Sequence, residues 1–256
     1  MSANSSAIET IKNRAPSDAE ALAQIFTAAT ISDNGTPGGR LTAILAATES
    51  NVVPGLQTGI RFHDRGFRVD FRDPWPSSDN QVGHFLTAVG LSFNPAKVEQ
   101  AFFARRLRDW LGAPPTMGNE EVALRLTIGH EKAADPGLGT VAEGATGLGM
   151  LGGLVGMAAG AGMEVLNVFR TQFAACTSAD ILVFRDAERA LGTGRPLNMA
   201  AAKPRLRGIR VTSSQRGNSY EDLLLSLYGW RLGQDIKLRR IASKADITTW
   251  LRGNLM

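Results

Sequence analysis

The chain has 256 residues, of which 43% are hydrophobic and 20% charged, and its formal net charge is +4. These values are typical of a globular protein with a hydrophobic core, built as one large domain or two small ones. The single cysteine, Cys176, excludes an intramolecular disulfide and any cysteine-rich zinc site. Residues 1–16 are polar and lack the hydrophobic stretch of a secretion signal. We therefore expect a flexible N-terminus over 1–16 and a cytoplasmic protein, or one exported without a signal peptide.

The first third of the chain predicts two helices and one hairpin. Ser17 and the acids after it are typical of a helix start, so we expect a helix to about residue 30, then a glycine-rich loop and a second helix over 40–50. A β-hairpin is predicted at about 59–72, where apolar and polar residues alternate on both sides of a turn. The alternating apolar residues are Ile60, Phe62, Phe67, Val69 and Phe71.

Helical spacing of apolar residues dominates the rest of the chain. The expected helices cover residues 78–94, 95–107, 119–134, 179–191, 220–232 and 244–251, with Asn119, Ser178 and Ser219 as caps of three of them. We therefore predict a mainly α fold, a multi-helix globular bundle with a small β-hairpin. The domain organisation is a single globular domain over 17–256, or two packed lobes over 17–136 and 137–256, with a basic loop at 192–217.

Residues 144–163 form a run of twenty residues without a charge, eight of them glycine. Gly152, Gly156 and Gly160 recur every four residues, a spacing that lets two helices approach closely. Twenty such residues can span a bilayer, but each glycine weakens a helix by about 0.8–1 kcal/mol relative to alanine. We therefore predict a central glycine-rich helix inside a soluble fold. A segment that enters membranes after rearrangement and a flexible loop are the two alternatives.

A basic tract covers residues 189–220, with seven lysine or arginine side chains and no acid. Such a tract can bind phosphates, an anionic membrane or an acidic partner. The simpler interpretation is a solvated loop whose arginines pair with acids elsewhere. Arginine and phenylalanine also alternate over 61–72, which suits single-stranded nucleic acid but also follows from a two-sided hairpin. We expect an anionic polymer or a protein as partner ahead of nucleic acid or a membrane, and the sequence does not define the oligomeric state.

Two of the three histidines, His84 and His130, lie in polar strings that also have the apolar spacing of helices. The helix face that carries His84 lacks charged residues, so we expect it to be covered rather than solvated. An imidazole titrates near neutral pH and can accept or donate a proton, and the adjacent Glu131 can orient it or accept the proton itself. We predict that both imidazoles meet in one hollow as acid and base groups assisted by Glu131. The alternative is that each histidine only satisfies backbone carbonyls.

The helix expected from residue 220 carries Asp222, Ser226 and Gly229 on one face, a groove of small residues with one acid. We predict that substrate enters this groove and that Asp222 completes the catalytic set, although Ser219 and Asp222 also fit a capping box. The predicted substrate-binding residues are amide, hydroxyl and arginine side chains: Asn80, Gln81, Asn218, Ser226, Arg205 and Arg207.

Known catalytic motifs are missing from the chain. The string at His130 lacks the second histidine of a zincin helix, and the glycines of 147–152 match the dinucleotide fingerprint without a preceding strand. Cys176 is expected to be a small buried residue rather than a nucleophile. We therefore predict a hydrolase-like enzyme that uses histidine and glutamate acid–base chemistry on an anionic or polymeric substrate. The alternative is a non-catalytic, effector-like interaction or membrane-active protein that uses 144–163 and 189–220. No cofactor is predicted, and a divalent metal ion is the less favoured alternative.

Overall fold

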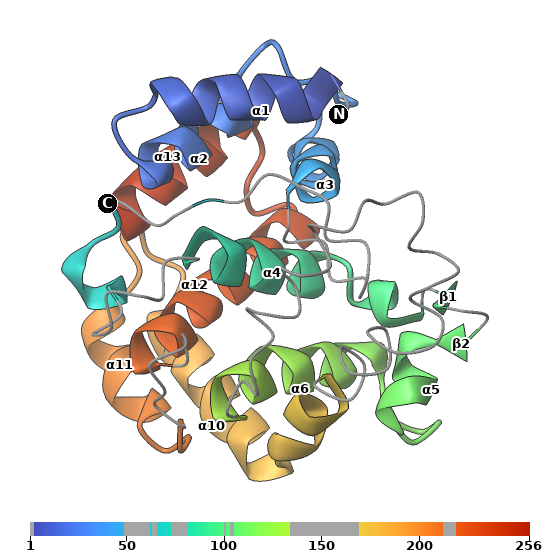
Figure 1. Cartoon of the computed structure of the whole chain (residues 1–256). Coiled ribbons are helices and arrows are strands. Elements are labelled where there is room, and N and C mark those ends of the chain that lie inside the picture. The colour runs from blue at the N-terminus through green and yellow to red at the C-terminus, as the bar shows by residue number, and fades with distance from the viewer. Residues whose placement is uncertain are drawn as a thin grey trace.

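The computed structural model describes residues 3–48, 62, 66–72, 81–99, 101–102, 105–133, 169–211 and 219–256. Within them the fold is mainly α-helical, as predicted, and helices pack around one another in a globular bundle (Figure 1). Strands β1 (Ala101–Phe102) and β2 (Arg105–Arg106) form a short antiparallel pair. The glycine-rich segment 144–163 lies outside the described residues.

One layer of the bundle consists of α1 (Ala3–Arg14), α2 (Asp18–Thr27), α3 (Pro37–Ala47) and the C-terminal α13 (Lys244–Leu255) (Figure 1). The expected flexible N-terminus is therefore a helix over most of its length. Its Ile8 is completely buried, and Ile11 packs against the same core. Only a few apolar residues form this stripe, so the polar composition of the segment does not predict a helix.

The buried side chain of Arg40, on α3, connects several elements of this layer. This side chain is 2% exposed, and its Nη1 donates hydrogen bonds of 2.8 Å to the carbonyls of Ile25 and Ala28. Its Nε pairs with Asp33, which Lys244 of α13 also contacts at 3.3 Å. One buried guanidinium thus ties the end of α2 to the following loop and to α3.

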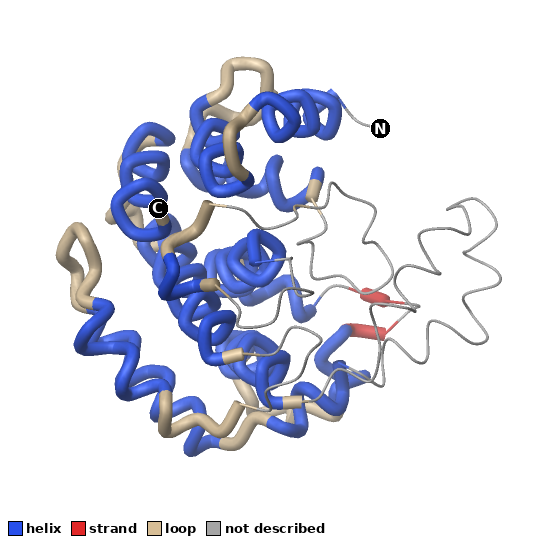
Figure 2. The backbone as a smooth tube through the Cα atoms, turned by 60° about the vertical axis from the view of Figure 1, so that its left-hand side comes forward, coloured by secondary structure: helices blue, strands red, loops and turns tan. Residues whose placement is uncertain are grey.

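The centre of the bundle is the pair formed by α4 (Gln81–Phe93) and α12 (Tyr220–Lys237), which are in contact (Figure 1). Figure 2 shows that helices make up most of the described backbone around this pair. Ser219 caps α12 as predicted, accepting a 3.0 Å hydrogen bond from the Asp222 amide. A Cβ on Gly229 would lie 2.5 Å from the Phe85 carbonyl oxygen, and one on Gly233 would overlap Ser92 and the Val89 carbonyl. The two helix backbones therefore approach more closely than side chains at these positions would allow.

The third layer contains α6 (Asn119–Lys132), a helical segment over 169–175, α10 (Ser178–Leu191) and α11 (Met199–Leu206). The caps of α6 and α10 are Gly118 and Thr177, one residue before those predicted. Thr177 forms a capping box with Asp180, and the Asp180 carboxylate also binds Lys132 of α6 at 2.6 Å. Helix α11 lies inside the stretch expected to be the basic loop 192–217, because Asn198 caps it and Ala202 and Leu206 are buried.

Two further predictions differ from the structure. The hairpin at 59–72 is not confirmed: the described part of its second half contains a 3₁₀ turn, Val69–Phe71, and most of its first half lies outside the described residues. The helix expected over 95–107 is instead a 3₁₀ turn, Pro95–Glu99, followed by β1, β2 and the short α5 (Leu107–Leu111). Arg108 holds this region, since its guanidinium binds Glu99, Asn119 and the Met117 carbonyl.

Buried apolar residues from Ile8 to Leu255 form one cluster, so both halves of the chain contribute to a common core. Helix α12 is buried along almost its whole length. Among the helices of the described ranges, none is both long and apolar enough to cross a bilayer. At the centre of the fold, α4 packs against both α12 and α6, and these contacts fix the position of His84.

Candidate active site

His84, His130 and Glu131 come together in the structure, as the sequence predicted for the two imidazoles and their neighbour. His84 lies in the first turns of α4, and the other two residues end α6. Helices α4 and α6 are in contact. The convergence therefore depends on a tertiary contact between segments 47 residues apart.

The three side chains contact one another directly. His84 Nδ1 lies 2.9 Å from Glu131 Oε1, a hydrogen-bond distance. The His84 and His130 ring centroids are 4.7 Å apart, with the rings tilted by 47°. On the far side of His130, the Gln172 amide nitrogen lies 2.9 Å from Nδ1. The cluster thus consists of two hydrogen-bonded pairs, His84 with Glu131 and His130 with Gln172, whose imidazole rings are neighbours.

Gly129 explains how Gln172 reaches His130. A Cβ at this position would overlap the backbone carbonyl of Gln172, so only glycine lets the segment 169–175 pack this closely on α6. Gln172 is itself 2% exposed. Neither residue is predicted as part of the site from the sequence, where the only signal for Gln172 is a polar residue in a helical stretch.

The burial of the cluster is uneven. The Glu131 side chain is fully buried, whereas that of His84 is 15% exposed. The second carboxylate oxygen of Glu131, Oε2, is buried and has no hydrogen-bond partner among the described residues. Burying a carboxylate oxygen without a partner costs free energy, roughly 1–3 kcal/mol or more. Such a group is therefore a candidate for ligand binding.

The hydrogen bonds assign the tautomers. A carboxylate only accepts, so His84 donates its Nδ1–H to Glu131 and carries its lone pair on Nε2. With the Gln172 amide nitrogen as the donor, His130 accepts at Nδ1 and carries its proton on Nε2; a half-turn of the amide would reverse both roles. The cluster therefore pairs an imidazole that can accept a proton with one that can donate. The same three residues also offer two nitrogens and a carboxylate oxygen within 4.8 Å of one another, a set that can hold a metal ion.

The predicted groove on α12 is not open to substrate. Gly229 lies against α4, and Ser226 is 3% exposed. Asp222 is also buried, and its carboxylate accepts a 3.0 Å hydrogen bond from the Ser219 hydroxyl. The structure thus gives Asp222 a capping interaction and does not place it in the three-residue cluster. The small residues that suggested a groove instead receive a neighbouring helix.

The described part of the basic tract is paired with acids over much of its length. Arg205, predicted to bind substrate, lies 3.0 Å from Asp186, which also contacts Arg189. Lys203 pairs with Asp70 at 3.2 Å. Arg207, the other predicted arginine, is an exposed residue at the end of α11. Neither arginine is brought to the histidine cluster.

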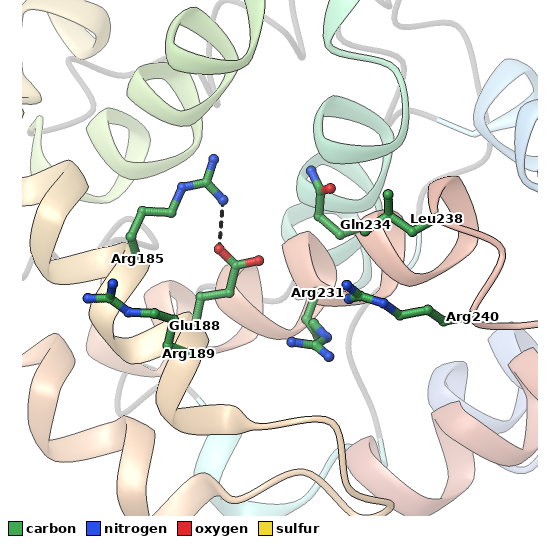
Figure 3. Close-up of a pocket in the computed structure, with 7 residues that line it drawn as sticks. All are labelled: Arg185, Glu188, Arg189, Arg231, Gln234, Leu238 and Arg240. Atoms are coloured by element: carbon green, nitrogen blue, oxygen red, sulfur yellow. Dashed lines mark hydrogen bonds and ion pairs between the residues drawn. The ribbon is translucent and has the colours of Figure 1, made fainter.

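A pocket of about 440 Å³ lies between α10 and α12 (Figure 3). Four arginines line it, and each has an acidic neighbour. Arg185 pairs with Glu120 and with Glu188, Arg189 with Asp186 at 3.3 Å, and Arg231 and Arg240 with Asp235 at 3.0 and 3.1 Å. An anion entering this pocket would compete with carboxylates for every guanidinium. The pocket also contains none of the cluster residues.

The structure does not describe the side chains of three further predicted site residues. Asn80 and Asn218 lie outside the described residues, as does the side chain of Gln81, although Gln81 is the first residue of α4. Cys176 is buried, as predicted, and burial together with the nearby Asp180 carboxylate raises the pKa of its thiol to about 12. A thiol with that pKa is protonated at neutral pH and is a poor nucleophile.

Comparison with known proteins gave no match: no protein-family model, curated protein or solved structure resembles this chain significantly.

Proposed function

We propose that the protein is a hydrolase-like enzyme whose reaction centre is the cluster of His84, His130 and Glu131. The observation that carries this proposal is the convergence of the three side chains, at 2.9 Å between His84 and Glu131 and 4.7 Å between the two rings. Hydrogen-bonded titratable groups that converge at a partly exposed position are typical of catalytic sites.

His84 is the proposed general base. Its Nδ1–H is fixed on Glu131, so its basic nitrogen is Nε2, and Glu131 stabilises the imidazolium that forms when a proton is taken up. This is the arrangement in which a buried carboxylate orients a histidine during acyl transfer. Glu131 is suited to that position because it is fully buried and has no lysine or arginine partner among the described residues.

His130 is the proposed general acid or hydrogen-bond donor. The Gln172 amide donates a hydrogen bond to His130 Nδ1, so the imidazole proton lies on Nε2. From Nε2 the proton can be given to a leaving group or can stabilise a developing oxyanion. A base and a donor on adjacent rings suit a hydrolysis in which water is deprotonated and the leaving group is protonated. An anionic or polymeric substrate remains part of the proposal, but the paired arginines of the basic tract do not by themselves select one.

The test is a hydrolysis screen of the purified full chain against chromogenic phosphate monoesters and diesters, carboxylic esters, glycosides and a peptide substrate. General acid–base groups contribute about 10²–10⁴-fold to a rate, so His84→Ala and Glu131→Gln should reduce the activity found by about that factor. The matched control is His63→Ala, which removes the chain's third histidine and should leave the rate unchanged.

The pH profile separates a catalytic role from a structural one. An acid and a base acting together give a bell-shaped dependence of kcat/KM on pH, and His130→Gln should remove one limb. Equal rates for the wild-type protein and His84→Ala, or no hydrolysis of any substrate class, would count against the proposed enzyme.

A further inference from the structure

We propose that His84, His130 and Glu131 bind a single divalent transition-metal ion. The inference rests on the proposed function in one respect, since it assigns a cofactor to the same reaction centre, where a bound ion would take the place of the proton on His130 Nε2. Binding can be measured without any substrate. Three observations support it: the spacing of the donor atoms, the chemistry of the donor set, and the Glu131 oxygen that has no partner among the described residues.

The donor atoms are already close to metal-ligand spacing. The ligand atoms of the three residues lie within 4.8 Å of one another. Ligands about 2.1 Å from a metal ion are separated from one another by about 3.0 Å in octahedral and about 3.4 Å in tetrahedral geometry. The 2.9 Å between His84 Nδ1 and Glu131 Oε1 matches adjacent ligands. Only His130 has to move, by roughly the 1–2 Å that a side-chain rotation supplies.

Glu131 is the strongest single indication of a missing ligand. It is fully buried, its Oε2 has no hydrogen-bond partner, and no lysine or arginine in the described ranges pairs with it. The neighbouring Lys132 directs its ammonium to Asp180, at 2.6 Å. A buried carboxylate that pairs only with an imidazole among the described residues is costly. A divalent cation between Glu131 and the imidazoles would remove that cost.

Gln172 is placed to support such a site. Metal-binding histidines commonly hold their other ring nitrogen in a hydrogen bond to an acceptor. If His130 binds the metal through Nε2, its Nδ1 must be protonated, and a half-turn of the Gln172 amide presents the oxygen as the acceptor. The 2.9 Å contact is unchanged by this rotation. Gln172 would therefore be a positioning residue.

The donor set limits the choice of metal. Two imidazoles and one carboxylate suit Zn²⁺, Co²⁺, Fe²⁺ or Mn²⁺, whereas Ca²⁺ and Mg²⁺ favour oxygen ligands. Two histidines and one glutamate are also the ligand set of catalytic zinc sites that keep an open position. Metal binding at His84 Nδ1 moves the ring proton to Nε2, so neutral imidazoles and an ionised Glu131 bind the ion without a net release of protons.

The experiment is a calorimetric titration of the chelator-stripped full chain with Zn²⁺. We expect one ion per chain and a loss of affinity of at least about 100-fold in His84→Ala, His130→Ala and Glu131→Gln. Gln172→Ala should cost less, about 10-fold. His63→Ala and Glu121→Gln, the latter changing another acid of α6, are the matched controls and should bind as the wild type does.

Titration of the wild-type chain with Co²⁺ keeps the test independent of variant folding, because the visible absorption of Co²⁺ reports nitrogen ligation and coordination number. Absence of binding, or binding that the three cluster variants leave unchanged, would overturn the metal site. Loss of hydrolysis in His84→Ala without any metal binding would uphold the proposed function and overturn this inference. Stoichiometric binding without hydrolysis would do the reverse.

Discussion

Replacement of Gly229 by alanine tests whether the face of α12 that resembled a substrate groove is filled by α4. A Cβ at this position would lie 2.5 Å from the Phe85 carbonyl oxygen and 3.1 Å from the Ala88 Cβ. Ordinary carbon–oxygen contacts begin at about 3.3 Å, so the two helices must separate by roughly 0.8 Å. The obstacle is a backbone carbonyl inside a helix, which no rotamer change can remove.

The expected loss of stability follows from two opposing effects. Overpacking a core costs about 1–3 kcal/mol, and the fixed carbonyl places Gly229→Ala at the upper end. Alanine in place of glycine within a helix returns about 0.8–1 kcal/mol. The free energy of unfolding should therefore fall by about 2 kcal/mol, which for a chain of this size lowers Tm by about 4–8 °C.

The same substitution should also disturb the cluster. Phe85 follows His84 in α4, so a displacement of α4 moves the His84 ring relative to Glu131. A misplacement of about 1 Å can cost a catalytic site about 100-fold. We expect Gly229→Ala to weaken hydrolysis and Zn²⁺ affinity, although residue 229 is not in the cluster.

Denaturant titration followed by circular dichroism measures the stability change. The matched control is Gly253→Ala, at an exposed helical position of α13 where an added Cβ meets nothing within 4 Å. It should raise the free energy of unfolding by about 0.8–1 kcal/mol. If Gly229→Ala were as stabilising as Gly253→Ala, the close packing of α4 on α12 would be refuted.

Three further changes address buried groups. Because burial raises the pKa of the Cys176 thiol to about 12, a thiol reagent should label it only as fast as the protein unfolds; rapid labelling of the native chain would contradict this. Asp180 has a lowered pKa: burial alone would raise it, but hydrogen bonds from Lys132 and Thr177 outweigh that effect. The stabilisation from the Asp180 carboxylate is therefore fully present above the ordinary carboxyl pKa and is lost as the pH falls through the lowered value. Asp180→Asn should lower the free energy of unfolding by about 1 kcal/mol at pH 7 and flatten its dependence on pH in the acid range. A pH dependence of stability identical to that of the wild type would contradict the ion pair. Arg40→Met should cost about 3 kcal/mol, since it leaves Asp33 and two carbonyls without their guanidinium, and an unchanged unfolding midpoint in denaturant would show that this interaction is weak.

Helix starts were predictable because they depend on residues a few positions apart. The caps at Ser17 and Ser219 and the beginning of α13 at Lys244 follow from local side-chain chemistry. The end of α12 was wrong: it was expected near residue 232, and the helix continues to Lys237. Gly233 resembles a helix end in sequence, but here its missing side chain admits Ser92 of α4. In sequence, a glycine that ends a helix cannot be distinguished from one that allows close contact with a second helix until the position of that second helix is known.

Elements whose stability comes from distant contacts were not predictable in the same way. Helix α1 has a polar sequence and depends on Ile8 reaching a core made by other helices. Residues 95–107 have helical spacing, yet Arg108 draws Glu99 and Asn119 together and the chain turns instead. In both segments the tertiary contact outweighs the local preference, which amounts to only a few tenths of a kcal/mol per residue.

The convergence of the histidines had one local indication, the uncharged face of α4 that carries His84. That face implied a covering partner, and α6 with His130 and Glu131 is such a partner. Nothing local identified α6 in particular, or Gln172, because the choice of partner depends on Gly129 and on the position of the segment 169–175. The groove predicted at Ser226 and Gly229 is the complementary case. A stripe of small residues indicates that something approaches closely, and because helix packing in a core excludes gaps, the nearest helix fills it before any substrate can.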